Sequence, residues 1–167
     1  MAETIATETL DAIDRKILSL LQDNGRMTNA ALAEAVGLTP TPMLQRIRKL
    51  EQSGVITGYM AMVDPSKVGR AVLAFIHVTL RSHGVPVHQR FLELVARLPE
   101  VLECHHIAGE EDFLLKIAVR DIAEVETFLL RRLGATDVIG RVKTTFVLST
   151  SKRTGPLVPA GAEEATP

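Results

Sequence analysis

The chain of 167 residues is 46% hydrophobic and 23% charged, with a formal net charge of -1 at pH 7. These values are typical of one or two folded domains. They exclude wholesale disorder and a global basic field that would attract nucleic acid or anionic lipid, so any such site must be a local patch. With Cys104 as its single cysteine, the chain can form neither an intramolecular disulfide nor a cysteine-pair zinc site. It has no apolar run long enough to span a membrane, and its acidic N-terminus does not resemble a secretory signal. We therefore expect a cytoplasmic protein.

The first 56 residues predict three helices joined by short turns. Apolar residues recur at helical spacing over residues 10–21, with Thr9 as the expected N-cap and Asn24-Gly25 as the stop. Thr28 is expected to cap a short second helix, which Gly37 ends in the left-handed conformation. Two helices so close together, followed at once by a third, indicate a compact helical domain.

Two prolines lie at the start of the predicted third helix. Proline is tolerated there because the first N–H groups of a helix have no partner within the helix. With Thr39 as N-cap, Pro40 is the first helical residue and Pro42 the third. We expect the Thr39 hydroxyl to accept a hydrogen bond from the N–H of Thr41, since Pro42 has none, and Gly54 to end the helix.

The remainder of the chain changes to a mixed pattern. Residues 59–63 alternate and predict a short strand that ends at Asp64-Pro65, and residues 66–70 resemble a hinge. Strands are then expected at 72–81, 101–108, 113–119 and 141–150, with helices at 86–98 and after Asp121. This β-α-β-β-α-β order predicts a ferredoxin-like domain, in which two helices cover one face of an antiparallel sheet. The fold class is therefore α+β.

The side chains of the third predicted helix divide into two faces. Met43, Ile47 and Leu50 share one narrow sector. The opposite side carries hydroxyl, amide and cationic groups, with Arg46 beside them: Thr41, Gln45, Arg48 and Lys49. Such groups read base edges and hold phosphates, although a plain solvated face has the same composition. The preceding helix and tight turn favour a helix-turn-helix that binds DNA.

Other chemical interpretations have less support. Cys104 and His106 share one face of their predicted strand and His105 points the other way, so a metal site there needs further ligands. No acid–base partner for a nucleophilic Cys104 is evident. We therefore predict no metal, no cofactor and no catalytic residues.

Motifs throughout the chain resemble the Lrp/AsnC family of transcriptional regulators. In the first half they are Leu10-Asp11, Asp14, Ile17-Leu18, Asn24-Gly25-Arg26, Leu32-Ala33, Gly37-Leu38-Thr39, residues 46–51, Gly54-Val55-Ile56 and Gly58-Tyr59. In the second half they are Val101, Glu103-Cys104 and residues 109–119. The resemblance covers about residues 8–152 and implies a winged helix-turn-helix over 8–62 and a ferredoxin-like effector-binding and oligomerisation domain over 72–152. Between them we expect a linker over 63–71, and the residues rich in Pro, Gly, Ala and Glu that follow predict a flexible tail over 153–167.

This resemblance also implies an effector, typically an amino acid, and homodimers that assemble into octamers or other multimers. The candidate effector loop is the turn between the strands predicted at 101–108 and 113–119. There Gly109 offers backbone N–H groups to a ligand carboxylate, and Glu110 and Asp112 offer carboxylates to its ammonium. A plain hairpin with a solubilising charge cluster is the alternative. The family's Pro-Gly-Val before the last strand is replaced here by residues 135–138, which include Thr136 and Asp137, so the ligand need not be leucine. Ala31 replaces a capping glutamate.

Together these patterns predict a DNA-binding transcriptional regulator whose binding to double-stranded operator DNA is modulated by a small effector. The expected DNA-binding residues are Thr39, Thr41, Pro42, Gln45, Arg46, Arg48 and Lys49. Arg46 lies beside the packed face of its helix, a position that also suits an intramolecular pair. The expected effector-binding residues are Gly109, Glu110, Asp112, Thr136 and Asp137. The alternatives are a ferredoxin-like metabolite-binding module or enzyme with a helical interaction domain, and a metal-responsive repressor.

Overall fold

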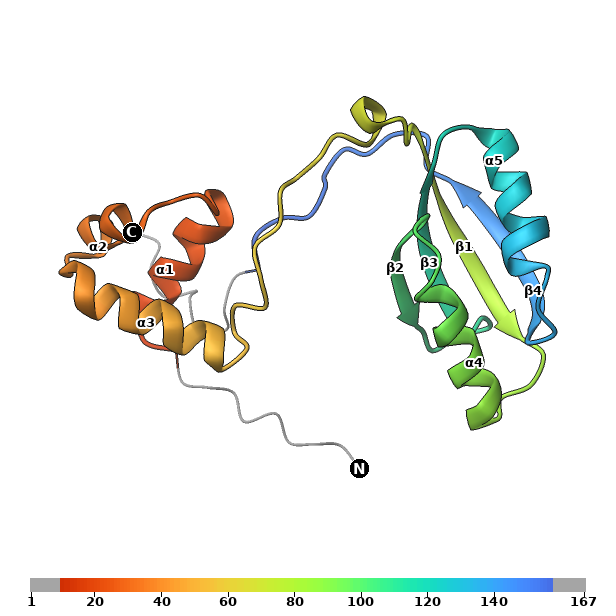
Figure 1. Ribbon diagram of the computed structural model, residues 1–167, viewed down its shortest axis with the longest axis horizontal. Coiled ribbons are helices and arrows are strands. Elements are labelled where there is room, and N and C mark those ends of the chain that lie inside the picture. Colours follow the sequence, from red (N-terminus) through yellow and green to blue (C-terminus); the bar gives the residue numbers. More distant parts are fainter. Residues whose placement is uncertain (1–9, 158–167) are drawn as a thin grey trace. The chain divides into compact units, whose positions relative to one another are not determined.

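The computed structural model describes residues 10–157, which form two compact units (Figure 1). The first unit contains residues 10–61 and also residues 152–157 from the end of the described chain, and the second contains residues 62–151. Within residues 10–157, no helix is long and apolar enough to cross a membrane.

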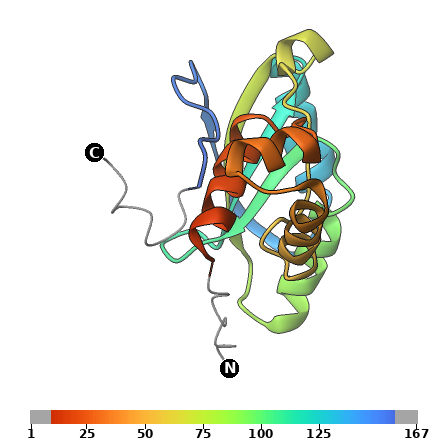
Figure 2. The ribbon, with the colours of Figure 1, turned by 90° about the vertical axis from the view of Figure 1, so that its left-hand side faces the viewer.

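The first unit is built of helices (Figures 1 and 2). They are α1 (Ala12–Asp23), α2 (Asn29–Val36) and α3 (Pro40–Gln52). Each contributes apolar residues to one shared core, whose buried members are Ile17, Leu32, Ala33, Met43, Ile47 and Leu50. The predicted helix order and the inward face of the third helix are confirmed.

Most helix ends of this unit follow the predicted signals. The Thr28 hydroxyl accepts a hydrogen bond from the N–H of Ala31 (3.2 Å), and Gly37 ends α2 with a φ of 72°. The first cap differs. Asp11 is the N-cap of α1, where it forms a reciprocal capping box with Asp14, whereas the predicted cap, Thr9, lies outside the described residues. The expectation was wrong because the carboxylate pair at N-cap and N3 satisfies two N–H groups at once.

The segment between the two units contains no strand, contrary to the expectation for residues 59–63. Met60 and Met62 are largely exposed, and the alternating pattern has no neighbouring strand to complete a ladder within the described chain. Asp64 instead caps the short 3₁₀ helix η1 (Pro65–Val68), which Gly69 ends with a φ of 72°.

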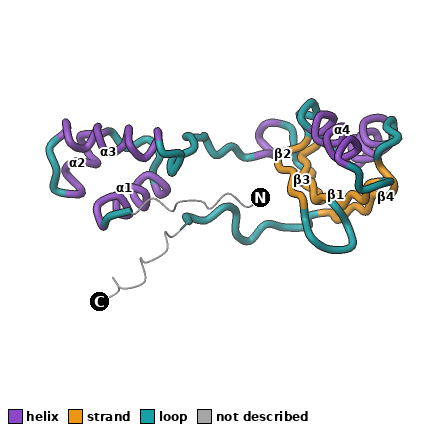
Figure 3. The backbone as a smooth tube through the Cα atoms, turned by 90° about the horizontal axis from the view of Figure 1, so that it is seen from below, coloured by secondary structure: helices purple, strands orange, loops and turns teal. Residues whose placement is uncertain are grey.

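The second unit is a four-stranded antiparallel sheet with the order β2-β3-β1-β4. The strands are β1 (Val72–Leu80), β2 (Val101–His106), β3 (Phe113–Val119) and β4 (Ile139–Phe146). Both α4 (Val85–Val95) and α5 (Ile122–Thr127) lie on one face of this sheet (Figures 1 and 3). Ala74, Ile76, Val78 and Leu80 are buried on that face, and the predicted ferredoxin-like fold is confirmed.

Two elements of this unit differ from the predicted ones. The second helix continues as a π-helical segment, Phe128–Leu133, because the five-residue spacing between the buried Phe128 and Leu133 fits the wider π turn. Gly134 follows it where a Cβ would lie 2.8 Å from the carbonyl oxygen of Leu130. The last strand was predicted over 141–150 but ends at Phe146. Its last hydrogen bond to β1 runs from Val147 N–H to Leu73 O, and β1 itself begins one residue before Leu73, so the ladder cannot continue.

Candidate nucleic-acid interface and effector loops

The two faces of α3 differ sharply in burial. Met43 and Leu50 are fully or almost fully buried against α1 and α2, together with Ile47. The opposite face is exposed and carries the predicted DNA-contacting side chains: Thr41, Gln45, Arg48 and Lys49. Since the apolar face fixes the rotation of the helix about its axis, these four side chains are presented on one surface of the unit.

At the N-terminus of α3 the proline arrangement is as predicted but the hydroxyl cap is not. Thr39 is the N-cap and Pro40 the first helical residue, and within the described residues the Thr39 side chain makes no capping hydrogen bond. Met43 N–H donates to the Thr39 carbonyl (3.2 Å), and Pro40 and Pro42 have no N–H, so the N–H of Thr41 is a first-turn donor that the helix itself does not use. The expected cap is not formed, because the N–H groups at the start of a helix can bind water in place of a side-chain hydroxyl.

Arg46 is placed differently from the other predicted DNA-binding residues. Its guanidinium donates to the carboxylates of Asp11 and Asp14, both at 2.7 Å. These hydrogen bonds raise the pKa of Arg46, and the Asp14 N–H together with Arg46 lowers the pKa of Asp11. Arg46 thus fastens α3 to the first turn of α1. The proposal that it contacts DNA therefore stays a prediction that competes with this intramolecular role.

The candidate effector residues lie in two loops beside the C-terminal end of β1. The first loop, residues 107–112, joins β2 to β3, and Asp112 N–H donates to the carbonyl of Val78 (2.9 Å). The second precedes β4, and Arg81 N–H donates to the carbonyl of Val138 (2.9 Å). The structure therefore brings the two predicted groups of residues to the same end of the sheet, one on each side of β1.

Asp112 has a structural role in holding the loop against β1. Its carboxylate accepts the N–H of the buried Leu80 at 2.7 Å and lies 3.1 Å from Nδ1 of His83. Neighbouring Glu111 lies 3.0 Å from Nζ of Lys143 on β4, and that hydrogen bond lowers the pKa of Glu111. Asp112 thus holds the loop to β1, and Glu111 holds it to β4.

The remaining predicted effector residues are more accessible. Glu110 is exposed, and a Cβ on Gly109 would meet no atom within 4 Å, so the loop backbone there is open to a ligand. In the second loop, the Thr136 hydroxyl accepts the Val138 N–H at 3.3 Å, and Asp137 lies 3.5 Å from the guanidinium of Arg90. The Asp137 pair is exposed and solvent-screened, so it remains open to exchange with a ligand.

The sheet register places Cys104 and His106 on the helix-covered side and His105 on the other, as predicted. No group of three metal-ligating side chains occurs in the part of the chain that the structure describes. Burial raises the pKa of the Cys104 thiol, which lowers the fraction of reactive thiolate.

Comparison with known proteins agrees with both halves of the structure. A family model described as the Lrp/AsnC ligand binding domain matches residues 73–157, and one described as winged helix-turn-helix DNA-binding matches residues 10–57. The leucine-responsive regulatory protein of Escherichia coli K12 is 38% identical over 149 residues, which cover 89% of this chain and 91% of that protein.

Solved structures give the same result. A transcriptional regulator of Neisseria meningitidis in complex with L-methionine superposes with a TM-score of 0.85 at 38% identity, covering 89% of this chain and 96% of that one. An AsnC family regulator of Agrobacterium tumefaciens superposes with a TM-score of 0.82, also at 38% identity and with the same coverage of both chains.

Proposed function

Because this chain belongs to the Lrp/AsnC family of transcriptional regulators, we propose that the exposed face of α3 reads its operator and that the two loops beside β1 bind its effector. The protein is a DNA-binding regulator whose binding is modulated by a small effector, and an amino acid is the supported class. We expect regulation without a catalytic step, in the cytoplasm, where the chromosome lies.

The separation of polar and apolar faces on α3 carries the DNA-binding assignment. In a major groove, Arg48 is suited to guanine, Gln45 to adenine and Lys49 to a phosphate. The Thr41 N–H, unused by the helix, adds a phosphate donor at the positive end of the helix dipole, and the Thr39 hydroxyl lies next to it in the chain. Pro42 keeps this first turn rigid.

This assignment is tested by a charge-matched pair of variants. The operator is first obtained by selection from random duplexes, and affinities are then measured by gel shift at fixed salt concentration. Arg48→Ala should weaken operator binding by about 1–3 kcal/mol, roughly fivefold to 150-fold. Lys16→Ala removes an equal positive charge from an exposed position on α1 and should change operator binding little. Equal affinities for wild type and Arg48→Ala would remove this residue from the interface.

For the effector site, the open backbone at Gly109 supports a role in binding a ligand carboxylate, and Glu110 supports a role in binding its ammonium. Asp112 contributes its remaining oxygen lone pairs, while Thr136 and Asp137 approach from the second loop. A thermal-shift screen with the twenty amino acids tests the class of effector, because a ligand that binds the native state raises its melting temperature. No shift with any of them would contradict an amino-acid effector.

The uncovered sheet face supports assembly. Leu73, Phe75 and Leu114 are half-buried there, and both helices lie on the opposite face (Figure 3). We propose that two copies pack these faces together in a symmetric homodimer and that dimers build an octamer or other multimer. Phe146 does not belong to this surface, because its register partner Ala74 lies on the helix side. Light scattering that shows a stable monomer at micromolar concentration would contradict the dimer.

A further inference from the structure

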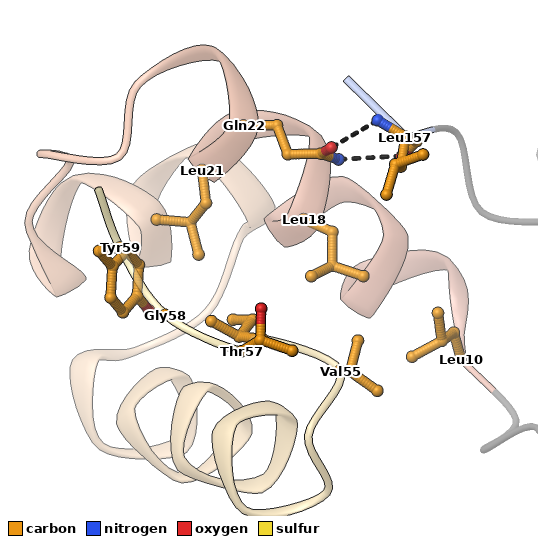
Figure 4. Close-up of a pocket in the computed structure, with 10 residues that line it drawn as sticks. Leu10, Leu18, Leu21, Gln22, Val55, Thr57, Gly58, Tyr59 and Leu157 are labelled. Atoms are coloured by element: carbon orange, nitrogen blue, oxygen red, sulfur yellow. Dashed lines mark hydrogen bonds between the residues drawn. The ribbon is translucent and has the colours of Figure 1, made fainter. Parts of the chain in front are cut away.

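An apolar groove of about 300 Å³ lies on the DNA-binding unit, away from the exposed face of α3 (Figure 4). Leu18 and Leu21 of α1 form one wall, and the chain from Val55 to Tyr59 forms the opposite one. At its rim stands Leu157, which is 135 residues from its neighbour Gln22 in the sequence. The groove is therefore bordered by the last described residue of the chain.

Gln22 holds Leu157 through two hydrogen bonds (Figure 4). The Leu157 N–H donates to Oε1 of Gln22 at 2.6 Å, and Nε2 of Gln22 donates to the Leu157 carbonyl at 3.0 Å. One side-chain amide thus satisfies both backbone groups of one residue, as an adjacent strand would do.

The contact depends on the backbone and not on the leucine side chain. The Leu157 side chain is 82% exposed, so its burial contributes little to the attachment. Gln22 is exposed on the outer side of α1, and its amide has no role in the helical core. The preceding Pro156 restricts the approaching chain and lowers the entropy lost when it is held.

The attached segment is a second covalent connection between the two units. The first runs from α3 through η1 to β1, and the second runs from the end of β4 at Phe146 to Leu157. Val147 N–H still pairs with Leu73 O in the sheet, so about ten residues separate this last sheet hydrogen bond from Leu157, the residue that Gln22 holds on α1.

We propose that residues 152–157 are a releasable latch, which Gln22 holds on the DNA-binding unit and through which displacement of β4 is passed to α1. The candidate effector loop before β4 and the ion pair from Glu111 to Lys143 both act on this strand. The coupling part of the proposal rests on the effector function proposed above, whereas the attachment does not. The segment that lies at the rim of the groove is thus residues 152–157 of the same chain. The Gln22 side-chain amide holds it through backbone groups alone.

Matched variants separate the backbone attachment from side-chain effects. Leu157→Pro removes the N–H donor, whereas Leu157→Ala retains both backbone groups. Gln22→Ala removes the amide, whereas Gln52→Ala removes an exposed amide from the end of α3. The readout is the rate of tryptic cleavage after the exposed Lys152 and Arg153 in the full-length native protein, because cleavage follows the population of the released segment.

We expect Gln22→Ala, which removes both hydrogen bonds, to accelerate this cleavage about tenfold, and Leu157→Pro, which removes the N–H donor alone, to accelerate it about threefold. Both controls should remain within about twofold of wild type. In the same two variants the effect of saturating L-methionine or L-leucine on operator affinity should fall at least threefold, with affinity for DNA in the absence of amino acid retained. Equal cleavage rates in all five proteins would overturn the latch.

Accelerated cleavage with an unchanged amino-acid effect would overturn its coupling role. A wild-type protein that binds no operator would contradict the function proposed above, and the cleavage rates would still decide whether the segment is latched.

Discussion

The two units of this protein are stabilised in different ways. The effector-binding unit buries fifteen residues of its described chain in one core, including Phe91, Phe113 and Phe128. The DNA-binding unit buries six, and none of them is aromatic. Its small core is supplemented by polar links between distant segments: the Arg46 ion pairs with Asp11 and Asp14, and the Gln22 amide on Leu157. The effector-binding unit has such links too, for example from Leu80 N–H to Asp112, but there they add to a much larger apolar core.

This difference in stabilisation fits the functions proposed for the two units, effector binding for one and operator binding for the other. A large apolar core gives the effector-binding unit a rigid frame for two loops, whereas the smaller core of the DNA-binding unit leaves its stability sensitive to a few polar contacts. Polar contacts at the surface exchange with water at low cost, so they are suited to being made and released.

The largest expected effect is in the aromatic core. Phe113→Ala should lower the free energy of unfolding of the effector-binding unit by about 3–5 kcal/mol, because it leaves a cavity beside Phe91, whose ring centroid is 4.5 Å away. Urea unfolding followed by circular dichroism measures this loss. The partly exposed Phe146→Ala is the control and should cost clearly less. Equal losses in both variants would contradict the dominance of apolar burial in this unit.

The next effect concerns a polar residue in this apolar unit. Asp112→Ala leaves the N–H of buried Leu80 without its acceptor and should cost about 1–3 kcal/mol of stability. Asp112→Asn keeps an acceptor oxygen and removes the charge, so it should remain near wild type in stability. Calorimetric titration of Asp112→Asn with the amino acid found in the screen then reports on the ligand alone. Unchanged affinity there would show that this carboxylate is structural and does not bind the effector.

Much of the fold could be predicted because its signals are local. Alternation placed the buried side chains of β1, and Thr28 and Gly37 marked the ends of α2. The failures depend on partners distant in the sequence. The strand expected at 59–63 lacks a neighbouring strand within the described chain, and the π turn at Phe128–Leu133 follows from burial of two residues five apart.

The candidate site shows the same division. Helical periodicity predicted which side chains of α3 are exposed, but it did not show that Arg46 is paired with Asp11 across 35 positions. Likewise, the free tail expected from residue 153 contrasts with the hydrogen bonds between Leu157 and Gln22, since no local pattern marks a single glutamine as a backbone partner. Residues 158–167 of that tail lie outside the described chain.

A smaller effect is expected from the polar link within the DNA-binding unit. Arg46→Ala should lower the stability of this unit by about 1–2 kcal/mol, since it leaves the largely buried carboxylate of Asp14 without its cation. Operator affinity, measured well below the melting temperature, should be unchanged if Arg46 serves only this link. A tenfold loss of affinity in the folded variant would show instead that Arg46 contacts DNA as first predicted.

The smallest effect is a pH dependence. The pKa of Asp11 is lowered by the Asp14 N–H and by Arg46, so its contribution to stability is present above its ordinary pKa of 3.8 and is lost as the pH falls through the lowered value. Wild type should therefore exceed Asp11→Asn in urea midpoint at neutral pH, and the difference should shrink as the pH is lowered below 3.8. A gap that stays constant over this range would contradict the linkage.

The return of the chain to α1 has a consequence for biosynthesis. Residues 10–61 leave the ribosome before the effector-binding unit, yet the segment that completes their unit, residues 152–157, is translated after it. Domains generally fold as they emerge, from the N-terminus onward. The helices of the DNA-binding unit can therefore form early, but the groove beside α1 receives its own segment only after the whole effector-binding unit has been made. A nascent or prematurely terminated chain would carry the DNA-reading helix without the latch.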